Sequence, residues 1–294
     1  MIAESNSSVC DVVLQEPYNL KKMIVADDGS AASKRALADA WVLAKRYQAE
    51  LVIVHVQSPL ELDNVEDGAG SRYQRLDIAT DVDGMTKALR AEGVQSRGIV
   101  RAGAPGDTLF NLCCEENADL LLMGAYGHNS QDRQTLGSTA EQLLRGVPCP
   151  VLTYGPNVSY PVISGRHSGP ILLPVSLPLE PRCLEEAIAF AQLFGEPLEV
   201  FHAVDRILCH NLKWFERHCE ELAFFIRANG VPARWSFLYG EAGCTICSEA
   251  REEGSPFILM PLKWRKGLSS LTSDNVAAHV IRRSSVPVLS YRCD

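Results

Sequence analysis

The chain has 294 residues, a formal net charge of −8 at pH 7 and 46% hydrophobic residues. This length suffices for two ordinary domains, each with its own core. The acidic balance argues against a protein that binds nucleic acid or an anionic membrane surface, and no apolar run is long enough to span a bilayer. Because the first residues lack the pattern of a secretory signal, we expect a cytoplasmic protein without disulfides.

Five short apolar runs alternate with helix-like stretches in the first half of the chain. The runs have the composition of strands that a parallel sheet buries on both faces. The stretches between them carry apolar residues at helical spacing. We expect strands over 22–27, 51–56, 94–101, 119–123 and 151–154, and helices after Ser30 or Ser33, near 76–92, after Gly103–Asp107 and over 138–145. This order predicts a doubly wound α/β fold, with helices on both faces of a parallel sheet.

A glycine-spaced loop follows the fourth expected strand. Gly124, Gly127 and Gly137 are separated by two and nine residues, and Ser138 comes next. Glycine permits a close approach of backbone or a positive φ. We expect Ser138 to form a capping box with Glu141 at the start of the following helix. The free N–H groups and the positive dipole end of such a helix favour a bound phosphate.

The chain then repeats itself. Residues 156–169 are rich in Gly, Pro and Ser and are expected to link a first domain at 20–155 to a second at 170–294. Equivalent positions lie 137 residues apart: Gly103 and Gly240, Gly124 and Pro261, Val151 and Val288, and Tyr154 and Tyr291. A constant offset of this kind indicates two tandem copies of one domain.

The second copy departs from the first in the loop. Its counterparts of Gly124, Gly127, Gly137 and Ser138 are Pro261, Trp264, Asp274 and Asn275, and Ser176 replaces Asp28. Proline lacks an N–H donor, tryptophan fills space, and aspartate repels a phosphate. We expect this copy to bind no nucleotide through the loop. Lys263, Arg265 and Lys266 are either substitute phosphate ligands or, more simply, a solvated basic loop.

The spacing G-x2-G-x9-G-S at the end of a buried strand resembles the nucleotide loop of the ATP-binding universal stress proteins. The terminal V-P-C-P-V-L run at 147–152 is similar to that family as well. The resemblance implies two tandem Rossmann-like domains of the adenine nucleotide alpha hydrolase type, each a five-stranded parallel sheet in the order 3-2-1-4-5. It also implies an internal pseudo-dimer through the last strands, and it leaves a homodimer open.

The same resemblance implies an ATP site, with or without Mg²⁺, in the first copy. The base would lie at the ends of the first and second strands, the ribose at the fourth, and the phosphates in the loop. The positions carried over are Ala26, Asp27, Asp28 and Val56 for the base, Met123 and Gly124 for the ribose, and Gly127, Gly137, Ser138 and Thr139 for the phosphates. Ala26 stands where family members often have Pro. Asp28 as a helix cap is the alternative, and His128 and Arg133 either add charge or remain exposed.

No reaction centre is visible in the sequence. The chain has neither a G-x-x-x-x-G-K-[ST] loop nor a G-x-S-x-G motif. We therefore expect a non-enzymatic, nucleotide-dependent regulator of a stress response, with weak ATP hydrolysis at most, a structural second domain and an unidentified protein partner. The alternatives are an interaction protein that binds no nucleotide, and a slow ATP hydrolase or phosphoryl-transfer enzyme.

The cysteines and histidines show no pattern typical of a metal site, and we expect no metal. Cys244 and Cys247 have the spacing of a redox motif but lie at an expected helix start, which favours buried helix cysteines. His55 and His202 are expected to be packed residues at strand ends. Cys209, His210, His218 and Cys219 also cluster, but their spacing on a helix would not converge on zinc.

Overall fold

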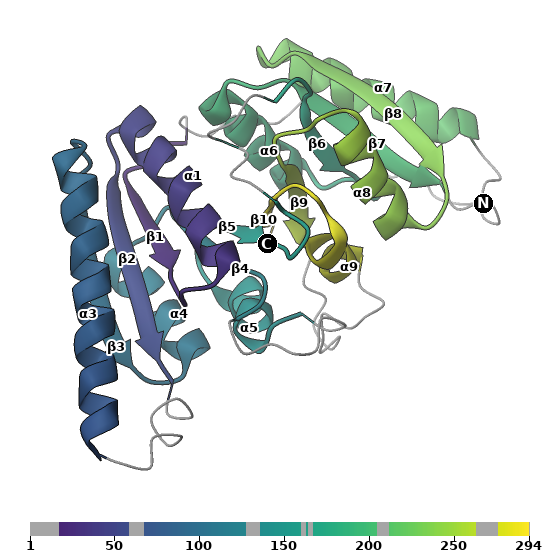
Figure 1. Cartoon of the computed structure of the whole chain (residues 1–294). Helices are drawn as coiled ribbons and strands as arrows, with labels where there is room; N and C mark the ends of the chain where they lie inside the picture. The colour runs from purple at the N-terminus through teal and green to yellow at the C-terminus, as the bar shows by residue number, and fades with distance from the viewer. Residues whose placement is uncertain are drawn as a thin grey trace.

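The computed structural model describes residues 18–58, 68–127, 136–159, 163, 167–204, 212–262 and 276–293. Strands and helices alternate along the chain in two successive halves (Figure 1). The first half contains β1 (Lys22–Ala26), α1 (Ala31–Tyr47), β2 (Glu50–Gln57), α3 (Gly68–Ala91), β3 (Ser96–Ala102), α4 (Pro105–Glu116), β4 (Leu120–Gly124), α5 (Ser138–Gly146) and β5 (Val151–Tyr154).

The second half repeats this order. It contains β6 (Ile171–Pro174), α6 (Pro181–Phe194), β7 (Leu198–Val204), α7 (Leu212–Ala228), β8 (Ala233–Tyr239), α8 (Ala242–Glu252), β9 (Ile258–Leu262), α9 (Val276–Arg283) and β10 (Val288–Arg292). The expected strands are present within a few residues at their ends. The helix expected near 76–92 begins earlier, at Gly68, because weak intrinsic helix propensity is readily overridden by context.

The sheet confirms the predicted fold class. Within each half all strand pairs are parallel, and the order is β3-β2-β1-β4-β5 in the first half and β8-β7-β6-β9-β10 in the second. Both orders correspond to 3-2-1-4-5. The sheet register also reproduces the offset of 137 residues: Gly124 lies opposite Tyr154, and Pro261 lies opposite Tyr291.

The two half-sheets are joined through their last strands. β5 and β10 pair in antiparallel fashion, with Leu152 opposite Leu289, and Thr153 Oγ1 adds a hydrogen bond of 3.1 Å to the carbonyl of Val288. The result is one ten-stranded sheet in which β5 and β10 lie at the centre (Figure 1). Helices α1 and α6 also meet, since Arg46 Nη2 donates to the carbonyl of Phe194 at 2.9 Å.

Helices cover both faces of the sheet and enclose two apolar clusters. One cluster lies under α1 and α6 and includes Leu152 and Leu289. The other lies under α4, α5, α8 and α9 and includes Leu121 and Ile258, both fully buried. Burying one such side chain contributes about 1.5–3 kcal/mol. Each cluster draws on both halves, so the halves share their core as well as their sheet. Within the described ranges, no helix combines the length and the apolar character that a membrane span requires.

The expectation of no disulfide is wrong. Cys183, near the start of α6, is bonded to Cys293, just after β10, with 5.1 Å between their Cα atoms. The two residues are 110 positions apart in sequence, and the parallel sheet brings them together. The expectation rested on cellular compartment, which says nothing about such proximity. Next to this bond, Tyr291 Oη donates to the carbonyl of Cys183 at 2.8 Å.

Candidate functional site

The candidate site lies where the strand order of the first half reverses. β1 pairs with β2 on one side and with β4 on the other, and all three run parallel. Their carboxyl ends therefore reach the same edge of the sheet. In doubly wound folds ligands bind outside this edge, in the crevice at the reversal point. The ends of β1 and β4 are the segments in which the sequence placed most of the base- and ribose-contacting residues.

The turn after β1 is built by two carboxylates. Asp27 is buried, and its Oδ1 accepts hydrogen bonds from Gly29 N at 3.1 Å and from Ser33 Oγ at 2.8 Å. Asp28 Oδ1 accepts from Ser30 N at 3.0 Å. Ser30 is the N-cap of α1, since its Oγ accepts from Ser33 N. Asp28 is thus not the cap itself, although it orients the cap residue.

His55 fixes the end of β1 from the neighbouring strand. Its Nδ1 donates to the carbonyl of Asp27 at 2.8 Å. In the second half His202 makes the same bond to the carbonyl of Val175 at 2.9 Å and stacks on Phe215. Both histidines therefore hold strand ends, which agrees with the packed role expected for them.

The glycine loop closes on itself. Gly137 N donates to the carbonyl of Ala125 at 3.2 Å, so the two ends of the loop meet. A Cβ on Gly137 would stand 2.8 Å from that carbonyl oxygen, and a Cβ on Gly124 would stand 3.1 Å from the Cβ of Ala32. Neither glycine has a positive φ. Close approach, rather than left-handed backbone, is therefore the reason that these positions require glycine.

The start of α5 differs from the prediction. The N-cap is Gly137, and Ser138 is the first helical residue, so Ser138 does not form the expected capping box. Glu141 instead pairs with Arg145 one turn later, where the two side chains lie at i and i+4. Because Gly137 has no side chain, the cap residue offers the first N–H groups of α5 no acceptor. Those groups and the helix dipole are suited to an anion.

The structure brings the carried-over residues to one edge of the sheet. Asp28 approaches the loop, because a Cβ on Gly127 would lie 3.6 Å from its Oδ2. Val56 is half-buried near the end of β2, Met123 is buried, Ser138 is exposed and Thr139 is half-buried. His128 and Arg133 lie outside the described residues. The same is true of Lys263, Trp264, Arg265, Lys266, Asp274 and Asn275 in the second half.

At the equivalent edge of the second half, the strand reaches one residue further. β9 continues through Pro261 to Leu262, which lies opposite Arg292. In the first half the strand ends at Gly124, and the chain turns into the loop with Ala125 N bonded to the carbonyl of Tyr154. Strand β9 therefore extends to the position at which the first half begins its loop. Pro261 also removes one N–H donor there.

The structure describes only part of the cysteine and histidine cluster at 209–219, and it contradicts the burial expected for the cysteine pair in α8. In the sequence cluster at 209–219, Cys209 and His210 lie outside the described residues, His218 is half-buried and Cys219 is buried. The pair in α8 was expected to be buried, but Cys244 is exposed and Cys247 is half-buried. The reason is that Cys244 lies in the first turn of α8, at the edge of the sheet, where the helix is not covered on every side.

The fold places the protein in the class of Rossmann-like α/β proteins, and comparisons identify the family. The universal stress protein family matches residues 19–154. A universal stress protein of Thermus aquaticus is 30% identical over 138 residues, which are 45% of this chain and 96% of that protein. One from Methanocaldococcus jannaschii is 27% identical over 149 residues, or 49% of this chain and 88% of the relative. The chain belongs to the universal stress protein family.

Solved structures agree on the fold over both halves. The crystal structure of a universal stress protein from Archaeoglobus fulgidus DSM 4304 is similar over 94% of this chain and 100% of its own, with a TM-score of 0.74 and 19% sequence identity. A functionally unknown protein from Pseudomonas aeruginosa PAO1 is similar over 94% of this chain and 93% of its own, with a TM-score of 0.64 and 19% identity. At this identity the likeness concerns the fold alone.

Proposed function

We propose that the first half binds ATP at the reversal point of its strand order, and that occupancy regulates a stress response through a protein partner. The observation that carries this proposal is the closed glycine loop. The bond from Gly137 N to the carbonyl of Ala125 sets the start of α5 beside the ends of β1 and β4. Membership of the universal stress protein family supports the same function.

The residues at this edge fit the parts of an adenine nucleotide. The first N–H groups of α5 and the hydroxyls of Ser138 and Thr139 are donors for phosphate oxygens. Gly127 and Gly137 carry no side chain that would keep a phosphate from the backbone. At the ends of β1 and β2, the carboxylate of Asp28 is an acceptor suited to the amino group of adenine, and Val56 offers an apolar contact for the ring.

In this proposal the chain binds one nucleotide and does not hydrolyse it rapidly. The extended β9, with Pro261 in place of Gly124, supports a second half that binds no nucleotide. That half contributes sheet and core through the β5–β10 pairing, in the manner of an internal pseudo-dimer. ATP then acts as a conformational ligand, which shifts the protein between states only by its difference in affinity for them. Mg²⁺ would accompany the phosphates.

A calorimetric titration of the stripped, intact chain with Mg-ATP tests the proposal. We expect about one site per chain. Replacing Gly137→Asp together with Ser138→Asn copies the second half into the first and should abolish binding, because a Cβ at 137 meets the carbonyl of Ala125 and the carboxylate repels phosphate. Gly84→Asp is the matched control: its Cβ would meet nothing within 4 Å, and it should leave the affinity unchanged.

Each other outcome overturns a defined part of the proposal. Two sites per chain would mean that the second half is also active. An absence of binding at millimolar ATP would favour an interaction protein that uses no nucleotide. Steady release of ADP that Asp28→Ala abolishes would indicate an enzyme rather than a regulator.

A further inference from the structure

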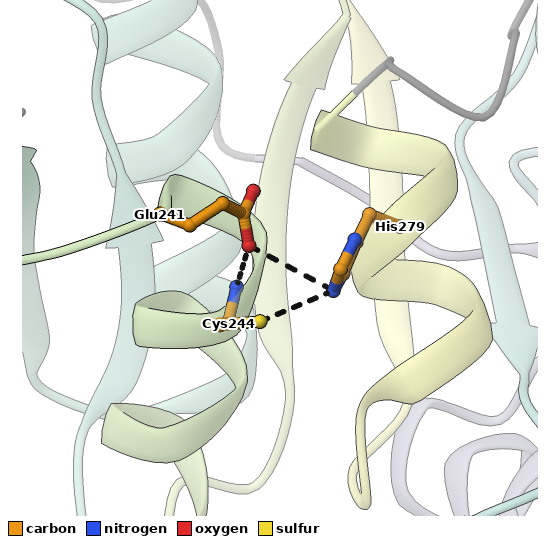
Figure 2. A group of neighbouring side chains, drawn as sticks. All are labelled: Glu241, Cys244 and His279. Atoms are coloured by element: carbon orange, nitrogen blue, oxygen red, sulfur yellow. Dashed lines mark hydrogen bonds and ion pairs between the residues drawn. The ribbon is translucent and has the colours of Figure 1, made fainter.

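Three side chains with different ligand atoms converge on the surface of the second half. Glu241, Cys244 and His279 place a carboxylate oxygen, a thiol sulfur and a ring nitrogen within 4.8 Å of one another (Figure 2). His279 Nε2 lies 3.7 Å from Cys244 Sγ and 4.0 Å from Glu241 Oε2. Glu241 and Cys244 are exposed and His279 is half-buried, so a solute can reach the cluster.

The local structure holds each of these groups in place. Glu241 is the N-cap of α8, and its two oxygens accept from Gly243 N at 2.9 Å and from Cys244 N at 2.8 Å. His279 projects from α9 onto the first turn of α8. A Cβ on Gly243 would come within 2.6 Å of the imidazole ring, so the ring packs directly on this glycine. Hydrogen bonds that orient a ligand are typical of protein metal sites.

The geometry favours a metal site over a catalytic relay. In a thiol–imidazole–carboxylate triad, the two ring nitrogens contact different partners. Here one nitrogen, Nε2, faces both the sulfur of Cys244 and the carboxylate of Glu241 (Figure 2). Three ligand atoms around one point instead resemble three corners of a coordination shell. Tetrahedral zinc with bonds of about 2.0–2.3 Å separates its ligand atoms by roughly 3.5 Å, close to these distances.

We propose that Glu241, Cys244 and His279 form a Zn²⁺ site that joins α8 to α9. A set of one sulfur, one nitrogen and one oxygen suits a borderline-soft cation, whereas Mg²⁺ and Ca²⁺ prefer oxygen ligands alone. Thiolate and carboxylate bring two negative charges side by side, which the divalent cation offsets. Water completes the tetrahedron. Binding releases the thiol proton to solvent as the zinc–sulfur bond forms.

The equivalent positions in the first half show what the fold alone requires at this place. The residues at the equivalent positions are Ala104, Asp107 and Gln142. Gln142 Nε2 donates to Asp107 Oδ1 at 2.5 Å, and a Cβ on Gly106 would meet the Gln142 side chain, as one on Gly243 would meet His279. Both pairs of helices thus pack in the same way. The fold requires a side chain at this place, but it does not require a thiol or an imidazole, which only the second half has at these positions.

Zinc titration of the intact, chelator-treated chain under anaerobic, non-reducing conditions tests the site. We expect one Zn²⁺ per chain and a higher melting temperature with the metal. His279→Gln, the residue found in the first half, should weaken binding at least tenfold without loss of fold as judged by circular dichroism. Co²⁺ replaces Zn²⁺ as a spectroscopic probe: a thiolate-to-cobalt absorption band should form and should be absent in Cys244→Ser.

Two further variants separate this site from other thiols and imidazoles of the chain. His218→Gln removes a histidine of the other sequence cluster and should leave both zinc affinity and the cobalt band unchanged. Introducing Ala104→Glu, Asp107→Cys and Gln142→His together should create a second zinc site in the first half. Unchanged affinity in folded His279→Gln and Cys244→Ser proteins, or loss of zinc in His218→Gln, would overturn the proposal. Neither result depends on nucleotide binding.

Discussion

Gly124 in the first half and Pro261 in the second lie at the same place in their sheets, opposite Tyr154 and Tyr291. In the first half the strand ends there, before the glycine loop, whereas β9 continues by one residue to Leu262. Where α8 begins and meets α9, by contrast, the second half has a carboxylate, a thiol and an imidazole, whereas the first half has Ala104, Asp107 and Gln142. The two copies therefore retain one backbone plan and differ in the chemistry at its edges. Packing constrains the shared core, whereas exposed turns are free to diverge.

An ion cluster shows the same contrast at the opposite edge of the sheet. Each half has one arginine between two glutamates: Arg97 with Glu50 and Glu116, and Arg234 with Glu199 and Glu253. The first half adds Lys22, which contacts Glu116 at 2.9 Å and lowers the pKa of that carboxyl. The second half adds buried Glu249, whose pKa is raised by burial and by the neighbouring carboxylates. The same scaffold thus shifts the pKa values of two carboxyls in opposite directions.

The largest effect is expected from the disulfide, which exists in the second half. Reduction of Cys183–Cys293 should lower the free energy of unfolding by about 2–4 kcal/mol, because the bond closes a long loop in the unfolded chain. The measurement is a urea titration with and without dithiothreitol. Hydrogen exchange should show greater loss of protection in β6–β10 than in β1–β5. The double variant Cys183→Ser with Cys293→Ser should not respond to reductant, and an equal response in both halves would contradict the comparison.

The two buried tyrosines give the next effect. Tyr154 Oη donates to the buried carboxylate of Asp39 at 2.8 Å, whereas Tyr291 Oη donates to the backbone carbonyl of Cys183. Tyr154→Phe should cost about 1.5–3 kcal/mol, the range for a bond to a charged group, and Tyr291→Phe about 1 kcal/mol, the value for a neutral bond. Urea midpoints of the two variants, which are each other's controls, measure the difference. Equal losses would show that the acceptor is not the cause.

The smallest effect distinguishes Glu249 and Glu116, two carboxyls whose pKa values are shifted in opposite directions. A carboxyl whose pKa is raised in the folded protein stabilises that protein below the ordinary pKa of about 4.3, and this contribution is lost as the pH rises. Glu249 should therefore destabilise the protein at pH 7. A carboxyl whose pKa is lowered in the folded protein has the opposite effect, so Glu116 should stabilise the protein at pH values above about 4.3. We expect Glu249→Gln to raise, and Glu116→Gln to lower, stability at pH 7 by less than about 1 kcal/mol each. Melting temperatures at pH 7 and near pH 4 should show both differences shrinking in acid; shifts of the same sign would refute the contrast.

Much of the fold could be predicted from the sequence, because apolar periodicity depends on local residue order. Strand β5 has the predicted bounds, and the offset of 137 residues predicted the equivalent pairing of Gly124 and Pro261. The resemblance of the glycine loop to a known family gave the strand order and the candidate nucleotide residues. Helix starts were less predictable, since whether Gly137 or Ser138 caps α5 depends on which backbone conformation the loop closure imposes.

Contacts between distant segments were decided by the tertiary structure. The sequence could not pair Cys183 with Cys293, because proximity across 110 residues depends on where α6 packs relative to β10. It could not join Glu241 and Cys244 to His279 for the same reason: the ligands lie on two helices separated by a strand. The sequence by itself determined the repeated α/β plan and the loss of the glycine loop in the second copy. Only the packing of α8 against α9 decided which polar side chains meet, since residue order does not encode distance between helices.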